Sequence, residues 1–152
     1  MNRLRDLRED ADLSLEKVGK KLGVYKSTIG DYENEELQMS TKALCSLADC
    51  YNTSTDYILY NTDDIIPHNI TPRDKHNRLK EIRRKNKCTQ LKIGNLLYLT
   101  QSGYSNYERG VADIPVPVLL KLSEFYKTSI DYLLCRTDNP SPYTKSKIKK
   151  TS

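Results

Sequence analysis

The sequence is poor in residues that interrupt helices, with six glycines and six prolines among 152 residues. No apolar run approaches the roughly 20 residues that span a bilayer, and the first stretch, MNRLRDLRED, is too charged to be a secretion signal. We therefore expect a cytoplasmic protein without a membrane partner. No segment sustains the alternation of apolar and polar residues that is typical of a strand, so the predicted fold class is all-α.

The sequence also lacks the ligand clusters of metal sites. Its cysteines show no CxxC spacing, and its two histidines, His68 and His76, fall in a predicted linker. Zinc and iron–sulfur sites need convergent ligands at short, fixed spacings. We expect no metal and no cofactor, and instead reduced thiols in the interior. The four thiols are Cys45, Cys50, Cys88 and Cys135.

The sequence contains an internal repeat of one unit. Residues 2–63 align with 77–138 without a gap when Asn2 is placed on Asn77, and roughly a third of the aligned positions are identical. NRLRDLR meets NRLKEIR, and TSTDYILYNTD meets TSIDYLLCRTD. The repeat predicts two domains, 1–63 and 77–138, with a linker at 64–76 and a disordered basic tail at 139–152. In the linker, Ile65 and Ile66 are expected to pack against the first domain.

Apolar residues recur at helical spacing in five short segments of each copy, which predicts a five-helix domain. The third helix is expected at about 26–33 in the first copy and 100–108 in the second, and the fourth helix of the second copy at 118–126. Gly110 suits the positive φ that closes the third helix, and Glu35 replaces it in the first copy. Hydroxyl residues are expected to cap the helices at Ser14, Ser40 or Thr41, Ser54, Thr89, Thr100 and Ser129.

The second and third helices of each copy have the spacing of a helix-turn-helix, whose second helix lies in the DNA major groove. The string TQLKIGNLLYLTQSGYSNYERG, followed by SIDYLL, resembles the Cro and phage-repressor type of helix-turn-helix, also called the xenobiotic-response-element type. The resemblance covers both copies and implies two tandem lambda-repressor-like domains. It also implies a transcriptional regulator that binds double-stranded DNA.

The resemblance further implies roles for individual residues of the second copy. A glutamine that begins the second helix contacts the DNA backbone and orients its neighbour, and this position is Gln90. The first residues of the third helix, and one residue a turn later, reach base edges. Glutamine and asparagine can offer a donor and an acceptor together, and serine or threonine can serve bases or phosphates. These positions are Thr100, Gln101, Ser102 and Asn106.

The first copy departs from this pattern. Leu15 stands where the glutamine is expected, Tyr25 replaces the threonine, and Asp31 replaces the asparagine. A carboxylate that faces the groove meets the field of the phosphates, so specific reading by this copy is left open. Lys26 and Ser27 are its candidate DNA contacts.

The balance of charge also differs between the two copies, and it also favours DNA binding by the second. Residues 2–63 hold 8 Lys and Arg against 12 Asp and Glu, whereas residues 77–138 hold 11 against 6. Because phosphate neutralisation dominates nucleic-acid affinity, the second copy is expected to be the principal DNA reader. The candidates for phosphate attraction are the tail lysines and Arg78, Lys80, Arg83, Arg84, Lys85, Lys87, Lys92 and Arg109.

One repeated pair is expected to be structural. Arg8 and Glu33 have the same separation in the sequence as Arg83 and Glu108. In the resembled family this pair ties the first helix to the end of the third. Each pair is therefore expected to be a partly buried ion pair.

No nucleophile elbow, phosphate-binding glycine loop or dinucleotide fingerprint occurs, so we do not expect an enzyme. The leading hypothesis is a sequence-specific transcriptional regulator that represses by occupying an operator. The alternative is a protein-interaction or antitoxin-like module, in which the acidic first domain docks a protein partner or a second chain as a homodimer.

Overall fold

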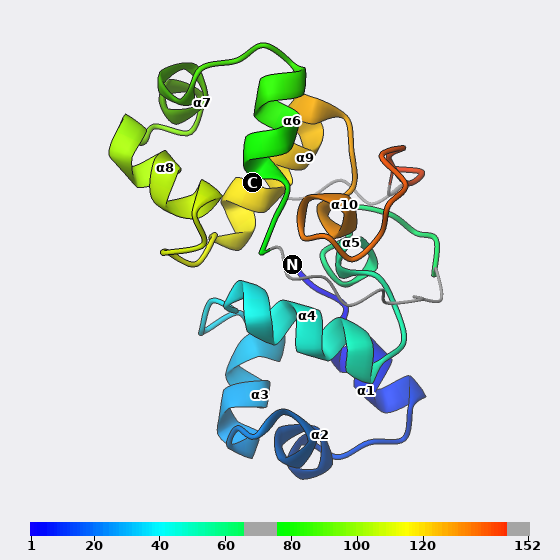
Figure 1. Ribbon diagram of the computed structural model, residues 1–152. Helices are drawn as coiled ribbons and strands as arrows, with labels where there is room; N and C mark the ends of the chain where they lie inside the picture. The colour runs from blue at the N-terminus through cyan, green and yellow to red at the C-terminus, as the bar shows by residue number, and fades with distance from the viewer. Residues whose placement is uncertain (66–75, 146–152) are drawn as a thin grey trace. The chain divides into compact units, whose positions relative to one another are not determined.

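The computed structural model describes residues 1–65 and 76–145, and these residues form ten helices (Figure 1). Their only pairing of extended backbone is an isolated bridge between Thr62 and Lys145. The all-α prediction is confirmed. Within the same residues, no helix is both long enough and apolar enough to cross a bilayer.

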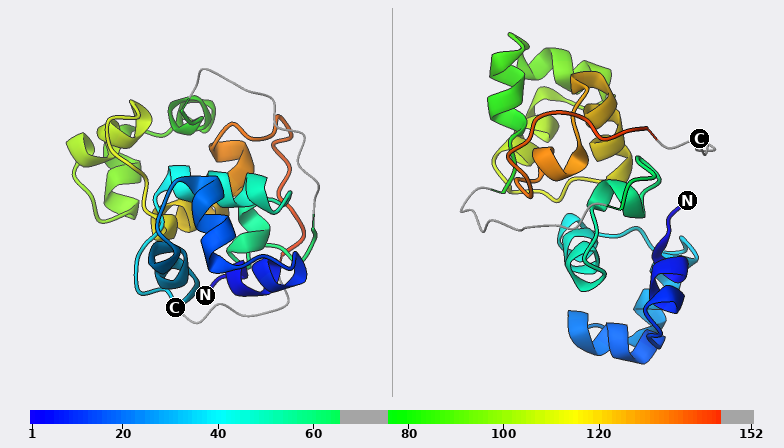
Figure 2. Two further views of the ribbon diagram at one scale, coloured as in Figure 1. Left: turned by 90° about the horizontal axis from the view of Figure 1, so that it is seen from below. Right: turned by 90° about the vertical axis from the view of Figure 1, so that its right-hand side faces the viewer.

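The described residues divide into two compact units, one with residues 1–65 and 143–145 and the other with residues 76–142. Each helix of the second unit begins at the position that the repeat assigns to its counterpart. Two further views show how the helices of each unit gather around a centre (Figure 2). Unit 1 contains α1 (Leu4–Asp10), α2 (Leu15–Leu22), α3 (Lys26–Glu33), α4 (Thr41–Cys50) and α5 (Thr55–Ile58). Unit 2 contains α6 (Leu79–Lys85), α7 (Gln90–Leu96), α8 (Gln101–Glu108), α9 (Val116–Tyr126) and α10 (Ile130–Leu133).

Side-chain caps start most of these helices. The hydroxyl of Ser14 accepts a hydrogen bond from the backbone N–H of Lys17, and Ser40 does the same for Ala43. Such a cap satisfies one of the N–H groups that the first turn leaves unpaired, and it adds about 1 kcal/mol. The predicted caps are confirmed, with Ser40 rather than Thr41 capping α4. The remaining caps are Ser54, Thr89, Thr100 and Ser129.

The fourth helix of the second copy begins earlier than predicted. The sequence predicts a start at Val118, whereas α9 runs from Val116 with Pro117 in its first turn. Proline is tolerated there because the first N–H groups of a helix have no partner within the helix. Pro117 therefore lies inside the helix and does not mark its boundary.

Each unit has an aliphatic core from the inward faces of its helices. Ile29 and Leu44 are fully buried in unit 1, and Ile93 and Leu119 are fully buried in unit 2. All four cysteines are free thiols; Cys88 and Cys135 are buried, and the other two are half-buried. No cluster of potential metal ligands occurs within the two described stretches.

A buried arginine closes each unit on itself. Arg78 donates hydrogen bonds of 2.7 Å to the carbonyl oxygens of Tyr132 and Thr137, and it pairs with Asp138 at 2.6 Å. Arg3 repeats this network in unit 1. The guanidinium of Arg78 also lies 4.3 Å from the centre of the Tyr132 ring. The residue before the first helix is thus fastened to the segment that follows the last helix.

Two expectations for loops meet a different outcome, and the expected tail is described only in part. Ile65 is 62% exposed and does not pack into unit 1, while Ile66 and most of the linker lie outside the described residues. Glu35 takes a φ of 61°, close to the 68° of Gly110, so α3 closes in the left-handed conformation without a glycine. Of the predicted tail, residues 146–152 are outside the described residues, and Pro140 accepts a hydrogen bond from the side chain of Thr128.

Candidate nucleic-acid interface

A sharp turn joins α7 to α8. The N–H of Leu99 donates to the carbonyl oxygen of Gly94 at 2.8 Å, and Tyr98 takes a φ of 57°. A Cβ atom on Gly94 would lie 3.0 Å from the carbonyl oxygen of Leu99 and 3.3 Å from that of Thr100. The close approach of α7 to the turn therefore favours glycine at position 94, because a side chain there would crowd the backbone that leads into α8.

The first residues of α8 are polar and exposed. The side chain of Thr100 accepts a hydrogen bond of 3.0 Å from the N–H of Gly103 and so caps the helix. Gln101 and Ser102 follow on the exposed surface, whereas Tyr104 is fully buried and anchors the opposite face of the helix. The N-terminal turn of α8 thus presents small polar groups to solvent on a helix held by the core.

An ion pair anchors α8 to α6. Nε of Arg83 donates to Oε1 of Glu108 at 2.5 Å and Nη2 donates to Oε2 at 3.2 Å, while Nη1 donates to the carbonyl oxygen of Cys88. The side chains of Glu108 and Arg83 are 1% and 11% exposed. The structure thus brings together the two residues that were expected to pair, in a geometry that fixes both ends of the guanidinium.

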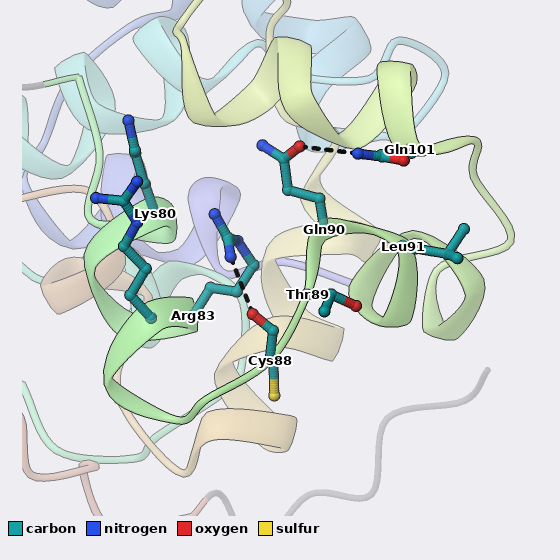
Figure 3. Close-up of a pocket in the computed structure, with 8 residues that line it drawn as sticks. Lys80, Arg83, Cys88, Thr89, Gln90, Leu91 and Gln101 are labelled. Carbon is teal, nitrogen blue, oxygen red and sulfur yellow. Dashed lines mark hydrogen bonds between the residues drawn. The ribbon is translucent and has the colours of Figure 1, made fainter.

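Hydrogen bonds extend from this ion pair to the surface. Nε2 of Gln90 donates to Oε2 of Glu108 at 3.0 Å. Nε2 of Gln101 donates in turn to Oε1 of Gln90 at 3.4 Å, as Figure 3 shows. An ionised carboxylate only accepts hydrogen bonds, so the amide nitrogen of Gln90 must face Glu108. Its oxygen then faces outward, and it receives the amide of Gln101.

The protonation state of Glu108 supports this orientation of the Gln90 amide. Burial acts to raise the pKa of Glu108, but the hydrogen bonds from Arg83 and Gln90 outweigh it and hold the pKa below the ordinary value. Glu108 is therefore ionised at neutral pH and acts as the fixed acceptor on which the two glutamines are ordered.

A cavity of about 570 Å³ opens beside these side chains, between α6 and the starts of α7 and α8 (Figure 3). Lys80 is exposed on α6, and the pocket also includes the capping residue Thr89 of α7. Basic and amide groups dominate this lining, which makes it suited to an anion. The lining residues are Lys80, Arg83, Arg84, Cys88, Thr89, Gln90, Leu91 and Gln101.

Asn106 lies beyond Gln101 on α8 and is half-buried. Nη2 of Arg109, the residue that ends the helix, donates to Oδ1 of Asn106 at 2.5 Å. Lys92 is exposed on α7. The candidate DNA contacts of the second copy therefore belong to two adjoining helices, α7 and α8, and to the residues that cap α8 at its two ends, Thr100 and Arg109.

Two of the predicted phosphate contacts are wrong. Arg78 is 5% exposed and Arg83 is 9% exposed, and both guanidinium groups are bound to acceptors of their own unit. A buried guanidinium needs such acceptors, because an unpaired charge in the interior is costly. The charge count of the sequence therefore overstates the basic surface of unit 2, because Arg136, which is 6% exposed, is buried as well as these two arginines.

Unit 1 repeats the ion pair of unit 2 but lacks the hydrogen bonds that lead from it to the surface. Arg8 pairs with Glu33 at 2.6 Å, but Leu15 occupies the position of Gln90 and carries no amide. Tyr25 precedes α3, makes no side-chain cap and is 83% exposed. Lys26 and Ser27, the candidate contacts of this copy, are exposed at the start of α3.

Comparisons with known proteins agree with this architecture. Residues 79–133 match the family described as helix-turn-helix, and residues 2–57 match the one described as helix-turn-helix domain. An 83-residue stretch is 39% identical to YobD of Bacillus subtilis (strain 168), described as an uncharacterized HTH-type transcriptional regulator. The match covers 55% of this chain and 70% of YobD. The chain belongs to the helix-turn-helix transcriptional regulators. It is a tandem, DNA-binding regulator of the Cro and repressor type.

A second relative of this regulator is the HTH-type transcriptional regulator ImmR of the same organism. It is 46% identical over 57 residues, which cover 38% of the regulator and 45% of ImmR. The regulator thus spans less than half of ImmR and more than two thirds of YobD. No solved structure matched the regulator.

Sequence reasoning missed two features of the regulator. One is the closing arginine of each unit, whose signal was present, since Arg3 and Asp63 recur as Arg78 and Asp138 with the same separation. The other is the hydrogen bond between Arg109 and Asn106, which has no counterpart in the first copy and so left no repeated pattern.

Proposed function

We propose that this regulator recognises a specific double-stranded DNA operator through α7 and α8 of unit 2. The observation that carries the proposal is the ordered chain from Glu108 through Gln90 to Gln101. It holds a side chain with both a donor and an acceptor at the exposed start of a short helix. A helix of this kind, placed in the major groove, reads base edges with its first residues.

Backbone contacts would come from the pocket beside Gln90. Lys80 and Arg84 stand one helical turn apart on α6, and Lys92 is exposed on α7. Each of these cations that neutralises a phosphate releases a counterion and steepens the salt dependence of binding. The hydroxyl of Thr89 would supply a further donor to the same phosphate. Ser102 completes the proposed contacts.

We further propose that the regulator represses transcription. Occupying an operator that overlaps a promoter excludes the polymerase and needs no chemistry from the protein. A reporter gene driven by a promoter that contains the selected operator tests this. Expression should fall when the regulator is supplied and should recover with Gln101→Ala; a rise with the intact regulator would mean activation instead.

The test of sequence recognition begins with the full chain and a random DNA pool. A single enriched sequence is expected, and its affinity is then measured for Gln101→Ala and for the matched variant Lys26→Ala in unit 1. Loss of one two-point base contact costs about 1–3 kcal/mol, so Gln101→Ala should weaken specific binding about tenfold to a hundredfold. An equal loss with Lys26→Ala would show that both units read DNA, and no enrichment would refute the proposal.

The second candidate is a docking role for unit 1. Leu15 removes the polar network, the unit is acidic, and Tyr25 stands 83% exposed where unit 2 has its capping threonine. If unit 1 docks a second copy, the regulator should sediment as a dimer and Tyr25→Ser should be monomeric. A monomer at all concentrations would exclude the homodimer and leave only a different protein partner.

A further inference from the structure

The amide of Asn106 is held in one orientation by its neighbour Arg109. Nη2 of Arg109 donates to Oδ1 of Asn106 at 2.5 Å, and the two residues are separated by three positions at the end of α8. Such pairs lie on one face of a helix, so both side chains belong to the same surface of α8. A guanidinium carries donors and no acceptor, so it can engage only the oxygen of the amide. The Nδ2 group must therefore point away from Arg109.

Gln101 is set with the opposite polarity. Glu108 is an acceptor and turns the nitrogen of Gln90 inward, and the outward oxygen of Gln90 then takes a hydrogen of Gln101. The oxygen of Gln101 has no such engagement in this chain of bonds. The amide of Gln101 thus offers its oxygen as an acceptor and its second hydrogen as a donor. The amide of Asn106 offers chiefly the two hydrogens of its nitrogen.

These two polarities correspond to different bases. In the major groove, guanine presents two acceptors, N7 and O6, whereas adenine presents the acceptor N7 and the donor N6, and cytosine presents a donor. An unconstrained asparagine suits adenine, because it gives one hydrogen bond and accepts another. In Asn106 the oxygen already binds a charged donor at 2.5 Å. That oxygen is a weaker second acceptor, and the two free hydrogens of the amide match guanine.

We propose that Arg109 is a positioning residue that sets the base preference of Asn106 to guanine. The inference rests on the proposed recognition of DNA by α8 and adds the base class read at its second position. Unit 1 offers an internal contrast, because Asp31 and Asn34 occupy the corresponding positions. A carboxylate has no hydrogen to give to guanine at neutral pH, and Asn34 accepts from Arg5 instead of donating to Asp31.

The experiment uses the full-length regulator and the operator that it selects. Asn106→Ala first identifies the base pair at which discrimination is lost. The affinities for all four base pairs at that position are then measured with the intact chain, Arg109→Ala and Arg109→Lys. The intact chain should prefer guanine. Arg109→Ala should lower the guanine-to-adenine ratio about tenfold, within the roughly 1–3 kcal/mol that one base contact carries, and leave the preferences at other positions unchanged.

Two controls separate positioning from other roles. In the double variant Arg109→Ala with Asn106→Ala, the ratio should equal that of Asn106→Ala alone, because a residue that acts through Asn106 has no effect without it. Arg109→Lys, which keeps a group with donors only, should retain a preference for guanine. Thermal unfolding of each variant is recorded, and a midpoint like that of the intact chain is expected since Arg109 is exposed.

Other results would overturn the inference. If Arg109→Ala weakens every sequence by the same factor and lowers the salt slope by about one, Arg109 is a phosphate contact and does not position Asn106. A preference for adenine in the intact chain would also refute it. If no DNA sequence is selected, the proposed function itself fails, an outcome distinct from an operator whose base preference ignores Arg109.

Discussion

Glu108 accepts from Arg83 and from Gln90 through the same carboxylate, at 2.5 Å from Nε of the arginine and 3.0 Å from the amide of the glutamine. One side chain therefore serves two purposes. It neutralises the buried guanidinium of Arg83, which joins α6 to the end of α8. It also orders the amide of Gln90, which in turn contacts Gln101 at the start of α8. Stability and the proposed recognition of DNA are thus coupled through a single residue.

The first prediction concerns the loss of that carboxylate. Glu108→Gln would leave the guanidinium of Arg83 without a counter-charge in a position that is 11% exposed, and breaking a buried pair on one side costs about 3 kcal/mol or more. The midpoint of urea unfolding should fall clearly. Glu33→Gln is the matched change in unit 1, where Arg8 and Arg5 both lie within reach of the carboxylate. An unchanged midpoint for Glu108→Gln would mean that the pair contributes nothing.

Acid should act on the same carboxylate. The pKa of Glu108 lies below its ordinary value, because hydrogen bonds from Arg83 and Gln90 outweigh burial. A carboxyl whose folded pKa is depressed binds its proton more readily when unfolded. Its contribution is therefore complete above the ordinary pKa of about 4, and it is lost as the pH falls from there through the depressed value. Stability measured from pH 6 downward should decline less steeply in Glu108→Gln; parallel curves would contradict the assignment.

Buried phenols make a prediction for alkaline pH. Burial raises the pKa of Tyr126 to about 12, and it also raises the pKa values of Tyr51 and Tyr104. A folded pKa above the unfolded value gives stability that is complete below about pH 10 and is lost as the pH rises toward 12. In an absorbance titration of the eleven tyrosines, the buried phenols should ionise after the others and only as the chain unfolds. Tyr126→Phe should reduce the absorbance change of this late phase. Simultaneous ionisation near pH 10 in the folded chain would refute this.

Two glycines of unit 1 should respond oppositely to alanine. A Cβ on Gly30, inside α3, would meet nothing closer than a side-chain carbon of Leu15 at 4.0 Å, so Gly30→Ala should stabilise by roughly 0.5–1 kcal/mol. A Cβ on Gly19 would lie 2.7 Å from the carbonyl oxygen of Val24, so Gly19→Ala should destabilise the turn between α2 and α3. Thermal unfolding of the two variants measures both signs. The same sign for both would contradict the packing of the turn.

The parts of the fold that depend on local chemistry could be predicted from the sequence. Ser14 and Thr100 were expected to cap their helices, because each comes just before a segment with apolar residues at helical spacing. A hydroxyl there can accept a hydrogen bond from an unpaired N–H of the first turn, and both side chains do so. The repeat strengthened the helix predictions, since each helix of one copy had a second example at the equivalent place in the other. The base-reading roles of Gln101 and Asn106 stay predictions.

What escaped the sequence depends on distant or compensating contacts. A count of charges cannot tell that Arg78 is buried against acceptors at the far end of its unit, because two of these partners are backbone carbonyls that leave no mark in the composition. Glu35 shows a different limit. After α3 the N–H of Glu36 donates to the carbonyl oxygen of Asp31 at 2.9 Å, and this closing turn holds Glu35 at a positive φ of 61°, which residues with a side chain ordinarily avoid.

The fastening of Arg3 to Asp63, and of Arg78 to Asp138, brings the entry and exit of each unit to the same spot. A module whose ends meet can be excised, inserted elsewhere or joined in a new order without pulling its helices apart. A copy of such a module would carry its own core and its own closing arginine, so the surface residues of each copy could differ, as Leu15 and Gln90 do, on the same scaffold.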